Sequence, residues 1–290
     1  MAEARFPDSA RFGWAALVAA LGALVAYLLV VLTPIGQQVE NLALLGAREE
    51  FRELRTESLT ELHEISALSF ALAIALVVAI AFLRRKPVLA ATAAGVMVSA
   101  VLATELVKRV LIRPELIEAP GHWVSNSFPS GHVAVAVAVS IGAVLVVPYA
   151  LRPAVTLGAA IYAAAIAQAV GIAGWHRLSD VIGAALVVLA VSSLALLWLT
   201  RAGRVEPFVK PRRIGFTLVA LVLGGAALIF GGGGLMGLSQ LLPVPSAPTA
   251  AELRLAYTTS LVLGVAAIGL VFLAFLWLIR PYAIDEPPEA

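Results

Sequence analysis

Long apolar stretches separated by short polar segments dominate this chain. Windows of about 19 residues pick out eight candidate helices, at 13–33, 66–83, 88–107, 133–150, 154–174, 181–199, 214–231 and 256–279. Most of these stretches approach the roughly 20 residues that cross a bilayer. We expect helices because lipid offers backbone N–H and C=O groups no partner outside the chain. The pattern therefore predicts an all-α, polytopic integral membrane helical bundle with about eight transmembrane helices.

Two segments between these helices have patterns of their own. Segment 34–65 carries apolar residues at roughly helical spacing among seven acidic residues, which predicts an amphipathic helix at the membrane surface. We interpret it either as a packing helix or as a lid for lipid entry. Gly231 to Gly234, followed by prolines at 243, 245 and 248, predict a flexible turn before the last helix. We divide the chain into a membrane core over 1–200 and two additional C-terminal helices over 201–290.

Composition agrees with a membrane location and excludes several kinds of chemistry. Hydrophobic residues make up 61% of the chain and charged residues 13%, against about half and a quarter in soluble domains. The net charge of +2 is too small to indicate nucleic-acid binding. The absence of cysteine excludes a disulfide framework, a zinc–thiolate site and a catalytic thiol.

The basic residues predict an orientation, because cytoplasmic loops carry an excess of Lys and Arg. A cytoplasmic N-terminus places twelve of the 20 Lys and Arg residues inside and eight outside. Both termini are then cytoplasmic, and we expect a bacterial plasma membrane. The eight outer residues are Arg48, Arg52, Arg55, Lys108, Arg109, Arg113, Arg177 and Arg254.

A basic cluster leaves the third predicted helix. Lys108 and Arg109 are followed by Arg113, and a helix that continued through Ile112 would place Arg109 and Arg113 on one face. Such a cluster suits phosphate oxygens. Its alternative is a set of long basic side chains that extend from a helix end toward water.

A Pro-Ser-Gly-His turn, Pro129 to His132, runs directly into the apolar helix from Val133. Proline and glycine shape the turn, Ser130 supplies a hydroxyl, and the helix N-terminus presents unpaired amides to an anion. This pattern is typical of a phosphate cradle. A helix capped by Ser130 is the simpler alternative, but it does not explain His132.

A third polar motif lies between the fifth and sixth predicted helices. His176 and Asp180 are four residues apart, so on a helical turn their side chains meet. Asp180 would then fix the imidazole tautomer and leave the other ring nitrogen as a nucleophile. A surface His–Asp pair at a helix start is the alternative. The predicted topology places all three motifs on the same, extracytoplasmic side.

These motifs resemble the type 2 phosphatidic acid phosphatase superfamily of membrane lipid phosphatases, over roughly residues 100–185. The family's P-S-G-H motif is present as Pro129 to His132. Its S-R-x5-H-x3-D motif is matched by His176 and Asp180. By this resemblance residues 1–200 form a phosphatase-like core.

The resemblance also implies roles for individual residues. His176 would attack phosphorus to form a phosphohistidine, Asp180 would orient it, and His132 would protonate the leaving oxygen. No metal and no cofactor is expected. The phosphate would be held by Lys108, Ser130 and the Gly131 amide.

Two basic positions of the family pattern are altered here. In the K-x6-R-P motif, Arg113-Pro114 stands two residues early, and Ala169-Val170 replaces the Ser-Arg of the third motif. We expect Arg109, Arg113 and Arg177 to replace the missing contacts. His122 is interpreted as a head-group contact or an ordinary loop histidine, and His63 as an ordinary one.

Together these features predict a metal-independent phosphatase that hydrolyses a phosphomonoester on a membrane lipid at the extracytoplasmic face. The candidate substrates are a polyprenyl phosphate or diphosphate, a polyprenyl-linked sugar phosphate, phosphatidylglycerol phosphate and phosphatidic acid. A lipid phosphotransferase, a non-catalytic lipid-phosphate binder or transporter, and a structural membrane subunit are the alternatives. The expected partners are the lipid substrate and the bilayer, and no sequence feature indicates an oligomeric state.

Overall fold

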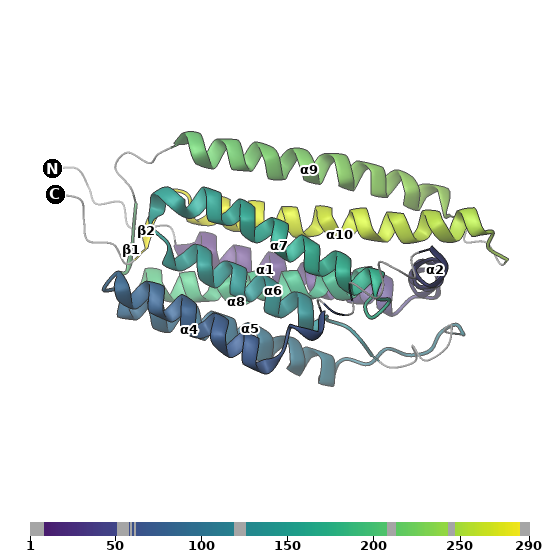
Figure 1. The fold of residues 1–290 in the computed structure, drawn as a ribbon, viewed down its shortest axis with the longest axis horizontal. Helices are drawn as coiled ribbons and strands as arrows, with labels where there is room; N and C mark the ends of the chain where they lie inside the picture. The colour runs from purple at the N-terminus through teal and green to yellow at the C-terminus, as the bar shows by residue number, and fades with distance from the viewer. Residues whose placement is uncertain are drawn as a thin grey trace.

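The computed structural model describes residues 9–50, 58, 60, 62–118, 126–207, 213–242 and 247–284. Its long helices lie roughly side by side, and a shorter helix, α2, lies across one end of the bundle (Figure 1). The helices are α1 (Ser9–Ala26), η1 (Tyr27–Val31), α2 (Pro34–Glu50), α4 (Ala67–Leu83), α5 (Pro87–Val110), α6 (Gly131–Val146), η2 (Tyr149–Leu151), α7 (Arg152–Ile172), α8 (Leu178–Arg201), α9 (Arg213–Gln240) and α10 (Ala250–Ile279).

All eight predicted apolar segments form helices. By length and composition, six helices in the described part of the chain are suited to crossing a membrane: Ser9–Val31, Pro87–Val110, Tyr149–Ile172, Leu178–Arg201, Ile214–Gln240 and Ala250–Ile279. The other two, α4 and α6, have 17 and 16 residues. The expected total of eight membrane spans therefore stays a prediction.

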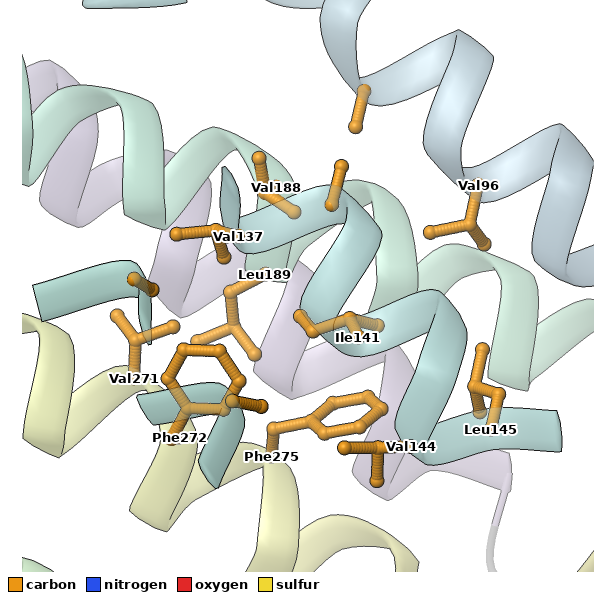
Figure 2. Packing of buried hydrophobic residues seen from close by; sticks show 14 of the residues in the cluster. Val96, Val137, Ile141, Val144, Leu145, Val188, Leu189, Val271, Phe272 and Phe275 are labelled. Atoms are coloured by element: carbon orange, nitrogen blue, oxygen red, sulfur yellow. The ribbon is translucent and has the colours of Figure 1, made fainter. Parts of the chain in front are cut away.

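Helix α6 lies in the middle of the bundle. Eleven of its 16 residues are buried. It packs against α5, α7 and α8, and Phe275 of α10 lies beside its Val144 (Figure 2). Its sequence is apolar on every side, as expected of a helix surrounded by protein or lipid. This burial matters for the site, because the first turn of α6 carries the Pro-Ser-Gly-His motif.

The glycine part of the predicted flexible turn, Gly231 to Gly234, is wrong. These residues lie within α9, which continues to Gln240. The prolines at 243 and 245 lie outside the described residues, and Pro248 lies between α9 and α10. A helical glycine costs about 1 kcal/mol relative to alanine, but in lipid the backbone has no other way to pair its polar groups. A β-carbon at Gly234 would lie 2.5 Å from the Leu263 side chain, so the glycine allows α9 and α10 to approach closely.

A small sheet closes the end of the bundle opposite α2. Strand β1 (Val205–Pro207) pairs antiparallel with β2 (Tyr282–Ile284), which joins the end of α8 to the end of α10. The ring of Phe12, near the start of α1, contacts Tyr282 at 5.6 Å between centroids. The described ends of the chain therefore lie together, away from α2 (Figure 1). The cytoplasmic location of this end of the bundle stays a prediction. The division of the chain into a core over 1–200 and two additional helices over 201–290 also stays one.

Helix α2 forms in the first part of the predicted amphipathic segment 34–65, of which 51–57, 59 and 61 lie outside the described residues. Its polar residues do not all face solvent, because Gln37, Glu40 and Asn41 are buried. Glu40, one of the seven acidic residues of this segment, is therefore a buried residue of α2. This helix supplies two side chains to the candidate site.

Candidate active site

The predicted contact between His176 and Asp180 is present. The Nδ1 atom of His176 lies 3.3 Å from Oδ2 of Asp180. The same oxygen accepts a hydrogen bond from the backbone N–H of Arg177 at 2.9 Å, because Asp180 stands in the first turn of α8 and caps it. With Nδ1 facing a fully buried carboxylate, Nε2 is the ring nitrogen left for chemistry.

The Pro-Ser-Gly-His turn is joined directly to this pair. Ser130 caps α6 by accepting from the backbone N–H of Val133, and its own N–H donates to the carbonyl oxygen of Asp180 at 3.0 Å. The ring centroids of His132 and His176 are 6.2 Å apart. Two motifs 40 to 50 positions apart in the sequence therefore form one site at the N-termini of α6 and α8.

Two buried contacts fix the segment that leads into this turn. Phe128 is 1% exposed and lies against the ring of Tyr27 at 5.5 Å between centroids. On its other side it meets Gly183, where an added β-carbon would lie 2.5 Å from a ring carbon of Phe128. Asn126 donates to the carbonyls of Lys108 and Leu111, at the end of α5, and accepts from the N–H of Phe128.

Lys108 and Arg177 lie beside the turn. The Nζ atom of Lys108 pairs with Oε1 of Glu105 at 3.1 Å, and a β-carbon on Gly131 would lie 3.6 Å from that Nζ. The amino group therefore sits next to the N-terminus of α6. Arg177 is buried and donates to the Ser127 hydroxyl at 3.3 Å.

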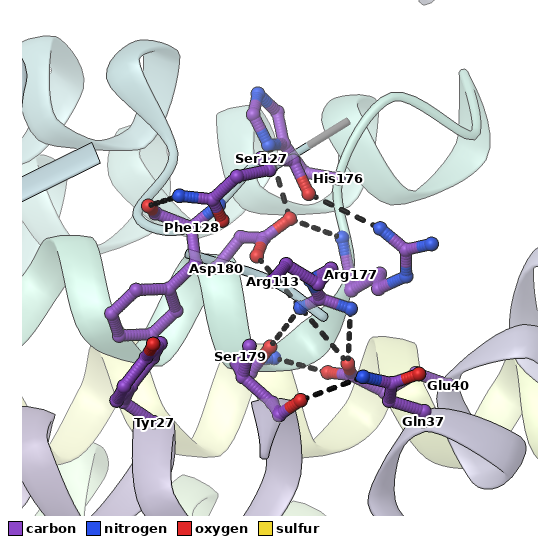
Figure 3. Close-up of polar contacts among 12 residues, drawn as sticks. Tyr27, Gln37, Glu40, Arg113, Ser127, Phe128, His176, Arg177, Ser179 and Asp180 are labelled. Atoms are coloured by element: carbon purple, nitrogen blue, oxygen red, sulfur yellow. Dashed lines mark hydrogen bonds and ion pairs between the residues drawn. The ribbon is translucent and has the colours of Figure 1, made fainter. Parts of the chain in front are cut away.

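Arg109 and Arg113 do not share a helical face, because α5 ends at Val110. Arg109 is exposed, and among the described residues it makes no hydrogen bond or ion pair with the site. Arg113 has turned inward instead. It lies 3.3 Å from Glu40 and 3.5 Å from Asp180, between the two carboxylates (Figure 3).

The sequence patterns did not reveal two other neighbours of the site. Glu40 comes from α2, 139 residues before its partner Ser179, and nothing local to it indicates a site. His63 is exposed, and its ring meets Trp175 edge-on at 5.8 Å, while His132 lies 5.4 Å from the same tryptophan. His122 lies outside the described residues.

The electrostatics of the site reflect its burial. Burial raises the pKa of Glu40, and the charge of Arg113 opposes this shift. Burial lowers the pKa of Arg177, and the like charge of Arg113 lowers it further. Burial also lowers the pKa of His132, as do His176 and Lys108. A bound anion would favour the protonated form of His132 again, because a nearby negative charge stabilises an imidazolium ion.

The residues that meet here can hold and attack an anion. Hydroxyl and amide groups, a lysine and an arginine surround the two histidines, one of which is backed by a carboxylate. Within the described ranges, no group of three or more His, Cys, Asp or Glu side chains is arranged to hold a metal ion. The expectation of a metal-free reaction itself stays a prediction.

Comparison with known proteins gives one match. A family model of the PAP2 superfamily matches residues 68–204, a segment that runs from the start of α4 to the end of α8 and contains the histidine motifs. No curated protein matches the chain significantly, and neither does a solved structure.

Proposed function

We propose, starting from the membership of residues 68–204 in the PAP2 superfamily, that this helical membrane protein is a metal-independent phosphatase acting on a lipid phosphomonoester. The observation that carries the proposal is the union of two motifs in one site. The hydrogen bond from the Ser130 N–H to the Asp180 carbonyl holds His132 near His176. Lys108, Arg177 and the N-terminus of α6 lie beside the two histidines and can donate to a phosphate.

In the proposed reaction, Nε2 of His176 attacks phosphorus while the bond from phosphorus to the lipid oxygen breaks. His132 gives its proton to the leaving oxygen, which departs as the lipid alcohol. Water then attacks the phosphohistidine, His132 takes up a proton from it, and inorganic phosphate leaves. The two steps together return both histidines to their starting protonation, so the reaction needs no further proton donor or acceptor.

The phosphate oxygens would be held by groups that already surround the turn. The helix N-terminus at Gly131 offers backbone N–H groups and the positive end of the helix dipole. Lys108 and Arg177 add positive charge from either side, and Ser130 adds its hydroxyl. Charge-assisted hydrogen bonds to oxygens that gain charge in the transition state are the main source of catalysis in such sites.

An apolar cavity next to the site supports a lipid as substrate. It has a volume of about 460 Å³ and lies among η1, α2, α8, α9 and α10, within the range of common ligand pockets. Exposed Leu29, Ile35 and Leu242 stand on its wall, so it borders the apolar outer surface. Four of its residues also line a smaller cavity that contacts His176: Glu40, Ala43, Leu178 and Ser260.

We further propose that the site faces the extracytoplasmic side of a bacterial plasma membrane and takes a polyprenyl or glycerolipid phosphate. The count of basic residues supports this side, and the adjoining cavity supports a long hydrocarbon chain.

The decisive experiment measures phosphate release from a panel of lipid phosphates by the purified full-length protein in nanodiscs, with EDTA present. Wild type is expected to release phosphate and to form an acid-labile phosphohistidine from at least one substrate. His176→Ala should lose both, and His132→Ala should lose turnover by about 10²-fold or more. Turnover that requires magnesium, or that survives His176→Ala, would contradict the proposal.

A further inference from the structure

Glu40 lies outside the segment that matches the family, yet it reaches the centre of the site. The residue is 5% exposed. Its Oε1 accepts a hydrogen bond from the backbone N–H of Ser179 at 2.8 Å, and its Oε2 lies 3.3 and 3.4 Å from the two terminal nitrogens of Arg113. Three donors face its two oxygens and favour the carboxylate form against burial, which raises the pKa of Glu40. These contacts bind α2 to the first turn of α8.

Arg113 is held by this carboxylate on one side and by the catalytic pair on the other. Its side chain is 4% exposed, and one terminal nitrogen lies 3.5 Å from Oδ1 of Asp180 and 3.3 Å from the hydroxyl of Ser179. Figure 3 shows the guanidinium between the two carboxylates. Removing either partner would leave a buried charge uncompensated, which is strongly unfavourable. Arg113 is therefore committed to protein groups.

A second side chain of α2 fixes the backbone next to Arg113. Gln37 stands three residues before Glu40 and so shares its helical face. Its amide nitrogen donates to the carbonyl of Pro114 at 2.7 Å, and its oxygen accepts from the N–H of Leu116 at 3.2 Å. Gln37 thus holds the segment after α5 at Pro114 and two residues beyond it. Helix α2 therefore positions Arg113 in two ways: Gln37 holds the backbone that follows it, and Glu40 holds its guanidinium group.

We infer that Glu40 is a positioning residue for the phosphatase site: through Arg113 it holds Asp180 so that the opposite carboxylate oxygen faces Nδ1 of His176. The inference rests on the proposed function and deepens it. It also reassigns Arg113, which the resemblance suggested as a phosphate contact, to a support behind the nucleophile. Phosphate binding then falls to Lys108, Arg177 and the groups of the turn.

The test separates positioning from phosphate binding. Glu40→Gln keeps the shape of the side chain and removes its charge. With p-nitrophenyl phosphate and with the best lipid phosphate, kcat should fall on the order of 10- to 100-fold, the range found when a partner that orients a ligating residue is removed, while KM stays within about twofold. If Arg113 were instead a phosphate clamp restrained by Glu40, its release would lower KM and leave kcat intact.

Binding of two anions tests the same point without turnover. Orthovanadate takes a fifth ligand from the nucleophile, whereas inorganic phosphate needs only the cradle. In thermal-shift titrations of the full-length protein, Glu40→Gln should weaken vanadate binding about tenfold and leave phosphate binding unchanged. Equal binding of both anions by variant and wild type, or tighter phosphate binding by the variant, would overturn the inference.

Two further variants control for misfolding and for a loss of activity that any Glu→Gln substitution would cause. Glu40→Gln combined with Arg113→Gln removes one negative and one positive buried charge together, so the net charge of the site stays the same, and its kcat should be no higher than that of Glu40→Gln. Wild-type turnover by this double variant would refute the positioning role. Glu252→Gln is the matched control, because Glu252 also accepts a hydrogen bond from a backbone N–H at a helix start, in an exposed position on α10. A wild type that hydrolyses nothing would refute the proposed function, and the anion titrations would still decide the role of Glu40.

Discussion

Replacing Gly183 with alanine should disturb catalysis although the residue carries no side chain. Gly183 lies one turn after Asp180 on α8, and the ring of Phe128 rests on it. An added β-carbon would lie 2.5 Å from the ring carbon Cζ of Phe128. Carbon atoms in contact prefer about 3.5–4.0 Å, so the ring or the helix must move by about 1 Å.

That movement would be transmitted to His132, the proposed proton donor. Phe128 precedes Pro129 directly, and His132 begins the helix that follows. A misplacement of about 1 Å can cost about 10²-fold in rate, and overpacking a buried contact costs about 1–3 kcal/mol of stability. We therefore expect Gly183→Ala to lower kcat for phosphate release by about 100-fold and to lower Tm in detergent, with a smaller change in KM.

Two companion variants make this prediction specific. Gly95→Ala changes a helical glycine on α5 where a β-carbon meets nothing within 4 Å, so it should be neutral or slightly stabilising. Phe128→Leu in the Gly183→Ala background removes ring atoms from the clash and should recover part of the lost rate. Wild-type kcat in Gly183→Ala would refute the argument that this contact places the turn.

Three other outcomes can be checked with the same protein. Asn126→Ala removes two hydrogen bonds to carbonyls at the end of α5, so it should lower stability by about 1–3 kcal/mol, seen as a lower Tm together with reduced turnover. Ala256→Phe would fill the apolar cavity without reaching the smaller one beside His176, and it should raise KM for long-chain lipid phosphates while KM for p-nitrophenyl phosphate stays the same. An equal effect on both substrates would disconnect the cavity from the lipid chain. Single cysteines at Ser127 and at Arg201 should be labelled from opposite sides of the membrane, and labelling from one side would contradict the predicted topology.

The sequence allowed the helices and the contact between His176 and Asp180 to be predicted because both depend on local spacing. Apolar stretches in lipid have little choice but to form helices. His176 and Asp180 meet as their spacing of four suggested, although His176 lies just before α8 and not on its first turn. The glycine run at 231–234 suggested a turn because glycine usually interrupts helices in water, whereas here the run is helical and Gly234 allows close packing against α10.

The supporting half of the site could not be predicted in the same way. Glu40 meets Ser179 across 139 residues, and in the sequence it is one of several glutamates in an amphipathic pattern. Arg113 is a similar case: its spacing of four from Arg109 suggested a shared helical face, but α5 ends at Val110, and the guanidinium lies between two carboxylates from other parts of the chain. Contacts of this kind leave no periodic signal.

The pairing of β1 with β2 ties the segment that matches the family to the C-terminal part of the chain. The family match ends at residue 204, but Arg152, fully buried at the start of α7, donates to the carbonyl of Tyr282 on the far strand. Phe272 and Phe275 of α10 fill space beside α6 and α8 (Figure 2). A chain shortened to the family segment would expose those apolar faces and strip an arginine of its acceptor. The enzyme-like core is therefore not a portable unit, and grafting its motifs into another membrane scaffold would require a substitute for α10 as well.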